Sequence, residues 1–152
     1  MADVDLSSIK QLLEDMLKER AANAAQKIAD DLTKEAKLAI EFFYDSYDPI
    51  KYSRQGGLRG TYKRYYKNPH GQIYHGGVEL MPGTGNYKSS LTGEPMGADF
   101  VSALAVFNGM HGNVEAFPFA VKTIPPRMSP SPYEIVEKKR QFILMNIYNY
   151  VN

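Results

Sequence analysis

The sequence predicts one α+β domain, in which a long N-terminal helix and a C-terminal helix pack on a small antiparallel sheet. Apolar residues recur at helical spacing through the first 47 positions. Aromatic and β-branched residues alternate with turn residues between positions 61 and 80, and a proline-rich stretch precedes a final helix. Because 152 residues is an ordinary length for one domain, we expect a single domain over residues 1–152.

The first segment is predicted to be a helical arm over residues 1–48. Asp48-Pro49 ends the helix, because the residue before a proline avoids the helical region. The small residues around Ala21–Ala25 leave two alternatives open, one continuous helix or two helices over 5–19 and 22–46. Its apolar residues form a first run, Leu6, Ile9, Leu12, Leu13, Met16 and Leu17, and a second run, Ile28, Leu32, Ala36, Ile40 and Phe43.

The middle segment, residues 49–124, is predicted to hold the sheet. Thr61–Tyr66 and Gln72–Leu80 have the composition of two hairpin strands, with turn residues between them. Six glycines and prolines predict a long loop over residues 82–97. Asp99–Phe107 fits a short buried helix, with a strand as the alternative, and Val114–Thr123 fits an edge strand.

The last segment, residues 125–152, combines a stiff proline-rich lead with a C-terminal helix. Ser131 is suited to cap this helix, Pro132 to occupy its first position and Glu134 to complete a capping box. Its apolar residues are expected to make contacts along the helix: Ile135, Phe142, Ile143, Met145, Ile147 and Tyr150.

No pattern in the chain predicts an enzyme, a cofactor or a metal site. Without cysteine there is neither a disulfide nor a thiolate ligand. His75 and His111 each begin an H-G-x-V-E pattern, but the His and Glu of an extended segment lie roughly 13 Å apart, too far to bind one ion. No serine stands in G-x-S-x-G. The adjacent acids Glu14/Asp15 and Asp30/Asp31 are expected to be solvated charges.

Charge is segregated along the chain. Residues 1–48 carry six basic and eleven acidic residues, whereas residues 49–78 carry six basic residues and no acid. The segment 51–67 is therefore the candidate site, as a nucleic-acid-binding module, as a subunit interface facing acidic helices, or as an ordinary strand with solvated bases. The candidate residues are Arg54, Arg59, Lys63, Arg64, Lys67, Tyr52 and Tyr62.

Three sets of loop residues accompany the predicted order of elements. The first set surrounds a Gly-Leu-Arg loop, the second a Gly-x-His-Gly turn, and the third the proline-rich lead. The residues are Pro49, Tyr52, Arg54, Gly57, Leu58 and Arg59, then Gly109, His111 and Gly112, then Pro125, Pro126, Ser131 and Pro132. Together with the order of elements, these residues resemble the small neck and tail-completion proteins of long-tailed bacteriophages. The sequence departs from the commoner members at residues 54–57 and in the length of the 82–97 loop.

This resemblance implies a structural virion subunit rather than an enzyme. Its partners would be further copies of itself in a homo-oligomeric ring, the neighbouring connector and tail-tube proteins, and DNA crossing the lumen. The subunit would be made in the host cytoplasm and reach the virion. The N-terminus lacks the pattern of a signal peptide, and no run approaches the apolar length of a membrane span, so we expect no membrane partner.

Overall fold

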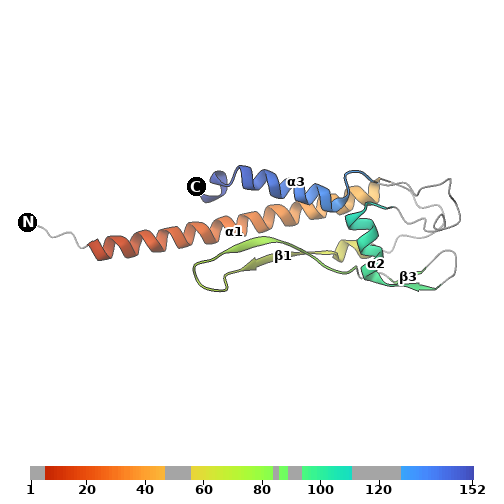
Figure 1. The fold of residues 1–152 in the computed structure, drawn as a ribbon, viewed down its shortest axis with the longest axis horizontal. Helices are drawn as coiled ribbons and strands as arrows, with labels where there is room; N and C mark the ends of the chain where they lie inside the picture. Colours follow the sequence, from red (N-terminus) through yellow and green to blue (C-terminus); the bar gives the residue numbers. More distant parts are fainter. Residues whose placement is uncertain (1–5, 47–55, 84–85, 89–93, 111–127) are drawn as a thin grey trace, which may run out of the picture.

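The computed structural model describes residues 6–46, 56–83, 86–88, 94–110 and 128–152 (Figure 1). Long helices and two antiparallel strand pairs confirm the α+β fold class. The elements in chain order are α1 Leu6–Asp45, η1 Gly57–Gly60, β1 Tyr62–Lys67, β2 His75–Leu80, β3 Tyr87–Lys88, β4 Pro95–Met96, α2 Ala98–Ser102, η2 Ala103–Phe107, α3 Pro132–Met145 and α4 Tyr148–Val151.

The N-terminal segment is one uninterrupted helix of 40 residues, so the alternative of two helices is wrong. Alanine has the highest helix propensity, and its small side chain permits the helix to approach a neighbour without a break. Ala24 and Ala25 are buried in this way. A Cβ atom added to Gly76 would overlap the carbonyl oxygen of Ala25, so β2 passes directly against the backbone of α1.

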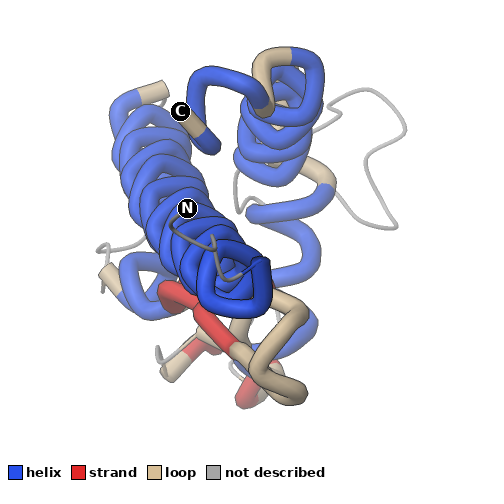
Figure 2. The backbone as a smooth tube through the Cα atoms, turned by 90° about the vertical axis from the view of Figure 1, so that its left-hand side faces the viewer, coloured by secondary structure: helices blue, strands red, loops and turns tan. Residues whose placement is uncertain are grey.

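Helix α1 lies between two layers. It contacts the β1–β2 hairpin on one side and α3 and α4 on another, and Figure 2 shows the strands and the C-terminal helices at different sides of α1. The hairpin confirms the predicted strand pair, with Tyr66 opposite Gly76 and Lys63 opposite Glu79. The first turns of α1 project past both layers (Figure 1).

The predictions for the remaining middle segment had mixed outcomes. Residues 82–97 were expected to be a loop, but the described part contains the paired strands β3 and β4. The helical alternative for Asp99–Phe107 is confirmed as α2 and η2. It is only partly buried, since Phe100 and Phe107 are 55 and 46% exposed. The strand predicted at Val114–Thr123 lies outside the described residues.

The hydrophobic core sits at the C-terminal half of α1. Phe43 and Ile143 are the largest apolar side chains that are fully buried, each 1% exposed. The second apolar run of α1 supplies much of this core, as its spacing predicted. Its main cluster consists of Ile40, Phe43, Tyr44, Leu58, Ala105, Val106 and Met128, with Tyr62, Leu80 and Ile135 packed against it.

Two sets of apolar residues lie outside the core. All six residues of the first run on α1 are between 43 and 77% exposed, because neither layer extends along those turns. At the C-terminal end, Phe142, Met145 and Ile147 are 53, 78 and 42% exposed, so these three side chains lie outside the core of this chain, contrary to expectation. Ile143 is buried while its neighbours Phe142 and Leu144 are exposed, because successive residues on a helix point about 100° apart.

The start of α3 confirms the predicted capping box. The Ser131 hydroxyl accepts a hydrogen bond from the Glu134 amide at 3.3 Å, and the Glu134 carboxylate accepts one from the Ser131 amide at 2.8 Å. We expect Ser131→Ala to lower the free energy of unfolding by about 1 kcal/mol, because the alanine cannot satisfy the Glu134 amide. Urea denaturation measures the loss. Ser131→Gly should lose only a few tenths of a kcal/mol, and equal losses in both variants would contradict a capping role.

Candidate functional site

The β1–β2 hairpin divides the candidate basic segment between two faces. Side chains alternate along a strand, so Tyr62, Arg64 and Tyr66 share one face and Lys63 and Lys67 share the other. The first face is turned toward α1, because Arg64 bonds to that helix and Gly76, opposite Tyr66, abuts it. Two further candidates, Tyr52 and Arg54, lie outside the described residues.

Arg59 is paired with an acid of its own chain. Its Nε and Nη2 atoms donate to the two carboxylate oxygens of Glu41 at 2.8 and 2.9 Å, a bidentate geometry. The guanidinium also lies 4.9 Å from the centre of the Tyr44 ring, and the Tyr44 hydroxyl accepts a hydrogen bond from the Leu58 amide at 3.0 Å. Gly56, with a φ of 69°, supplies the left-handed turn that precedes this contact. Together these contacts hold η1 against α1.

Arg64 makes a second pair of the same kind. Its Nε donates to Asp30 Oδ1 at 2.5 Å and its Nη2 to the Gln26 carbonyl oxygen at 3.4 Å. Asp30 and Glu41 are eleven residues apart, about three helical turns, so both acids lie on the side of α1 that faces the hairpin. Basic and acidic segments therefore meet within one chain, where the interface hypothesis expected a neighbouring subunit to supply the acid.

The expectation that the adjacent acids Asp30 and Asp31 are solvated charges is wrong, because both have partners within the chain. Asp30 binds Arg64, and Asp31 accepts a hydrogen bond from the Tyr150 hydroxyl at 2.7 Å. Burial, and then the bond to Asp31, raise the pKa of Tyr150 to about 12. Because adjacent residues point about 100° apart, one acid reaches the hairpin and the other reaches α4.

The Glu41–Arg59 pair predicts a dependence of stability on pH. The hydrogen bond from Arg59 lowers the pKa of Glu41 below its ordinary value of 4.5. A carboxylate with a lowered pKa stabilises the folded state above that ordinary value, and this contribution is lost as the pH falls through the lowered pKa. We expect Glu41→Gln to lower Tm at neutral pH and to make the acid-induced fall in Tm smaller. An unchanged pH profile of Tm would contradict the pair's role.

The outer face of the hairpin carries the remaining described bases. Lys63 and Lys67 are both exposed, and the Lys67 ammonium lies 5.1 Å from the centre of the Tyr65 ring. Gly77 stands across from Tyr65, and a Cβ atom there would meet nothing within 4 Å. This face is the part of the described segment that is open to an anionic partner.

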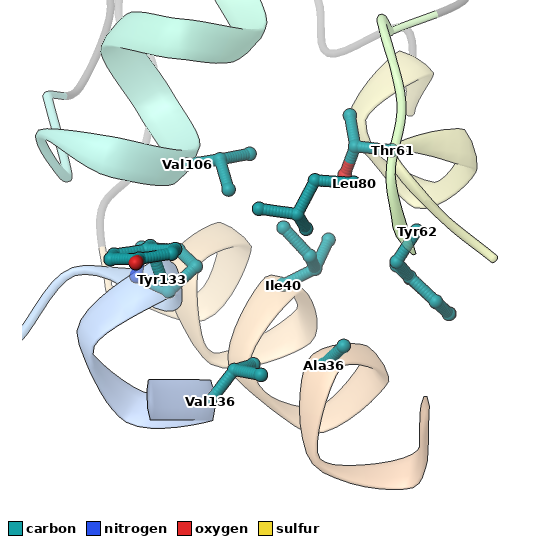
Figure 3. Close-up of a pocket in the computed structure, with 9 residues that line it drawn as sticks. Ala36, Ile40, Thr61, Tyr62, Leu80, Val106, Tyr133 and Val136 are labelled. Carbon is teal, nitrogen blue, oxygen red and sulfur yellow. The ribbon is translucent and has the colours of Figure 1, made fainter. Parts of the chain in front are cut away.

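Tyr62 belongs to the core rather than to a stacking surface. It is half-buried, packs against the core cluster, and has its pKa raised chiefly by burial. It also lines a cavity of about 10 Å³, roughly the space of one water molecule, among α1, the hairpin, η2 and α3 (Figure 3). The cavity is far too small for a cofactor.

The described residues give no metal centre. Within them no three His, Asp or Glu side chains converge on one point. His75 lies exposed on β2, and His111 is outside the described ranges. Over those same ranges, every helix falls short of the length or the apolar character that a membrane span requires.

Two uncovered apolar surfaces are the features that the sequence interpretation missed. The N-terminal stripe is the first run on α1. The C-terminal patch consists of side chains more than half exposed on α3, at its end and on α4. The stripe comprises Leu6, Ile9, Leu12, Leu13, Met16 and Leu17, and the patch comprises Phe142, Met145 and Tyr148. Leu144 is also exposed, but it points to the other side of α3 from Phe142. Grouped exposed apolar side chains mark surfaces that bind a partner.

Comparison of the chain with known protein families, with curated proteins and with solved structures finds no match.

Proposed function

We propose that the chain is a structural subunit of a tailed-phage particle. It assembles into a ring in the neck or tail-completion region and joins the connector to the tail tube. The observation that carries this proposal is the N-terminal stripe, an apolar surface on helical turns that project beyond both packed layers. The loop residues that resemble neck and tail-completion proteins support the same function.

The projecting turns need a partner for physical reasons. The stripe runs roughly 17 Å along α1, from Leu6 to Leu17, and its apolar side chains are exposed. In proteins most of the stability of a helix comes from packing of such an apolar face. Burial of a leucine side chain contributes roughly 1.5–3 kcal/mol, so association stabilises both the contact and the helix. A subunit that works by assembly accounts for this surface, and no catalytic group is needed.

Native mass spectrometry of the purified full chain across a range of concentrations tests the proposal. We expect a closed oligomer of one size to replace the monomer as concentration rises. Mass spectrometry of purified phage particles from a producing strain should find the chain in the virion. A chain that stays monomeric at every concentration, or that is missing from the particles, would contradict the function.

A second candidate, a nucleic-acid-binding module, is favoured by the outer face of the hairpin. Arg59 and Arg64 already have acidic partners on α1, so a phosphate backbone would meet Lys63 and Lys67, with Glu79 opposite Lys63 on the same face. If this function holds, Lys63→Ala with Lys67→Ala should lower the salt slope of duplex DNA binding by about two units. Arg64→Ala is the matched control, and an equal loss of slope in both variants would argue against the outer face.

A further inference from the structure

We propose that the N-terminal stripe of one copy docks on the C-terminal patch of the next copy. This inference rests on the proposed function, because it names the partner of the assembly surface described above. The contact joins two different surfaces, so an open chain of subunits keeps one free stripe at one end and one free patch at the other until a ring closes.

The face of α1 that carries the stripe already binds a C-terminal helix within the same chain. The Lys27 ammonium lies 5.2 Å from the centre of the Tyr150 ring and 3.4 Å from the Asn149 carbonyl oxygen. Asp31 accepts the Tyr150 hydrogen bond beside them. Lys27 and Asp31 follow Ile9 and Leu13 by eighteen residues, which is five full turns, so each pair lies on one line along the helix.

The stripe is therefore the continuation of an existing helix-binding face. At Lys27 and Asp31 that face is covered by α4 of the same chain, and about 27 Å further toward the N-terminus it is uncovered. The N-terminal part is also the more apolar one, since it carries leucine, isoleucine and methionine in place of charged residues. A helix from another copy extends the packing that the chain already uses.

The C-terminal patch has the chemistry to occupy this face. Phe142, Met145 and Tyr148 are 53 to 78% exposed, while Ile143 is buried. Aromatic and methionine side chains are enriched at protein interfaces. Docking of the patch on the stripe of a neighbour removes two apolar surfaces from water in one contact. Pairing of two stripes would leave the patch uncovered.

Introduction of negative charge at each surface tests the proposal on the full chain. The stripe variant carries Leu13→Glu with Leu17→Glu, and the patch variant carries Met145→Glu with Tyr148→Glu. Gln11→Glu is the matched control, since that exposed position lies on the opposite side of the same helix. We expect each double variant to remain monomeric with an unchanged circular dichroism spectrum, whereas the control assembles like the wild type.

Mixing the two variants gives the decisive result. The intact patch of the stripe variant can bind the intact stripe of the patch variant, so native mass spectrometry should find a 1:1 heterodimer and no larger species. If the patch variant alone assembles like the wild type while the stripe variant does not, stripes pair with each other and the inference is overturned. Wild-type assembly in both variants would overturn it equally, and a monomeric wild type would instead remove the proposed function.

Milder substitutions keep the test valid if a glutamate variant fails to fold. Leu13→Ser and Met145→Ser remove apolar contact without adding charge, and both positions are exposed in the single chain. We expect each to raise the concentration at half assembly at least tenfold, with Tm of the monomer unchanged. An unchanged midpoint in both serine variants would contradict the contact.

Discussion

Gly76→Ala is expected to lower the free energy of unfolding by about 3 kcal/mol, because the added methyl group overlaps the carbonyl oxygen of Ala25. The added methyl group is fixed to the backbone of β2, and the carbonyl oxygen belongs to the backbone of α1. Neither can swing aside as the end of a flexible side chain would. The hairpin must move away from the helix, and the Arg64–Asp30 pair is disturbed with it. Urea denaturation of the purified variant measures the loss.

Gly77→Ala is the matched control for this substitution. The neighbouring glycine lies on the outer face of the same strand, and its added Cβ atom would meet nothing within 4 Å. We expect a change of no more than about 1 kcal/mol, with stabilisation possible because alanine restricts the unfolded chain. Equal losses at Gly76 and Gly77 would show that β2 does not pass against α1 as described.

Phe43→Ala is expected to have the other large effect, a loss of about 3–5 kcal/mol in the free energy of unfolding. The Phe43 ring is 1% exposed and belongs to the central cluster of the core. Its removal leaves a cavity that the surrounding helices and hairpin cannot fill without moving. Thermal or urea denaturation monitored by circular dichroism gives the value.

The adjacent Phe42 supplies a control of identical chemistry. Its side chain is 57% exposed, because it points about 100° away from Phe43. We expect Phe42→Ala to change the free energy of unfolding by no more than about 0.5 kcal/mol. A loss at Phe42 as large as that at Phe43 would mean that the core lies on a different face of α1.

The features that the sequence predicts correctly are those decided by local chemistry. The Ser131 capping box, the end of α1 before Asp48-Pro49 and the β1–β2 hairpin all depend on residues close together in the chain. The prediction that the second apolar run of α1 supplies the core is also confirmed, since a helix buries the face on which its apolar residues recur.

Helical periodicity alone does not distinguish the exposed N-terminal stripe from a run of core residues. Both runs of α1 have apolar residues at the spacing of a helix, and only the lengths of the packed layers decide which run is covered. One feature of the sequence does indicate that the two runs differ. Leu13 and Leu32 are nineteen residues apart and therefore point about 100° apart, so the two runs do not share a face.

The charge pairs show a second limit of what can be predicted from the sequence. Segregation of acids in residues 1–48 and bases in residues 49–78 is visible without a structure, but it does not say whether the two groups meet within one chain. The hairpin lies along α1, which places Arg59 beside Glu41 and Arg64 beside Asp30. Those two arginines are already paired within the chain, and the exposed lysines of the outer face remain for other contacts.

Hydrogen exchange at low and high protein concentration tests most directly whether the stripe is an assembly surface. In the monomer, amides near Leu6–Leu17 belong to a projecting helix with no packed layer and should exchange quickly, whereas amides near Ile40 and Phe43 should be protected. At concentrations where oligomers form, we expect protection to rise at the stripe and to stay constant in the core. Oligomers that leave the stripe amides in fast exchange would contradict the account.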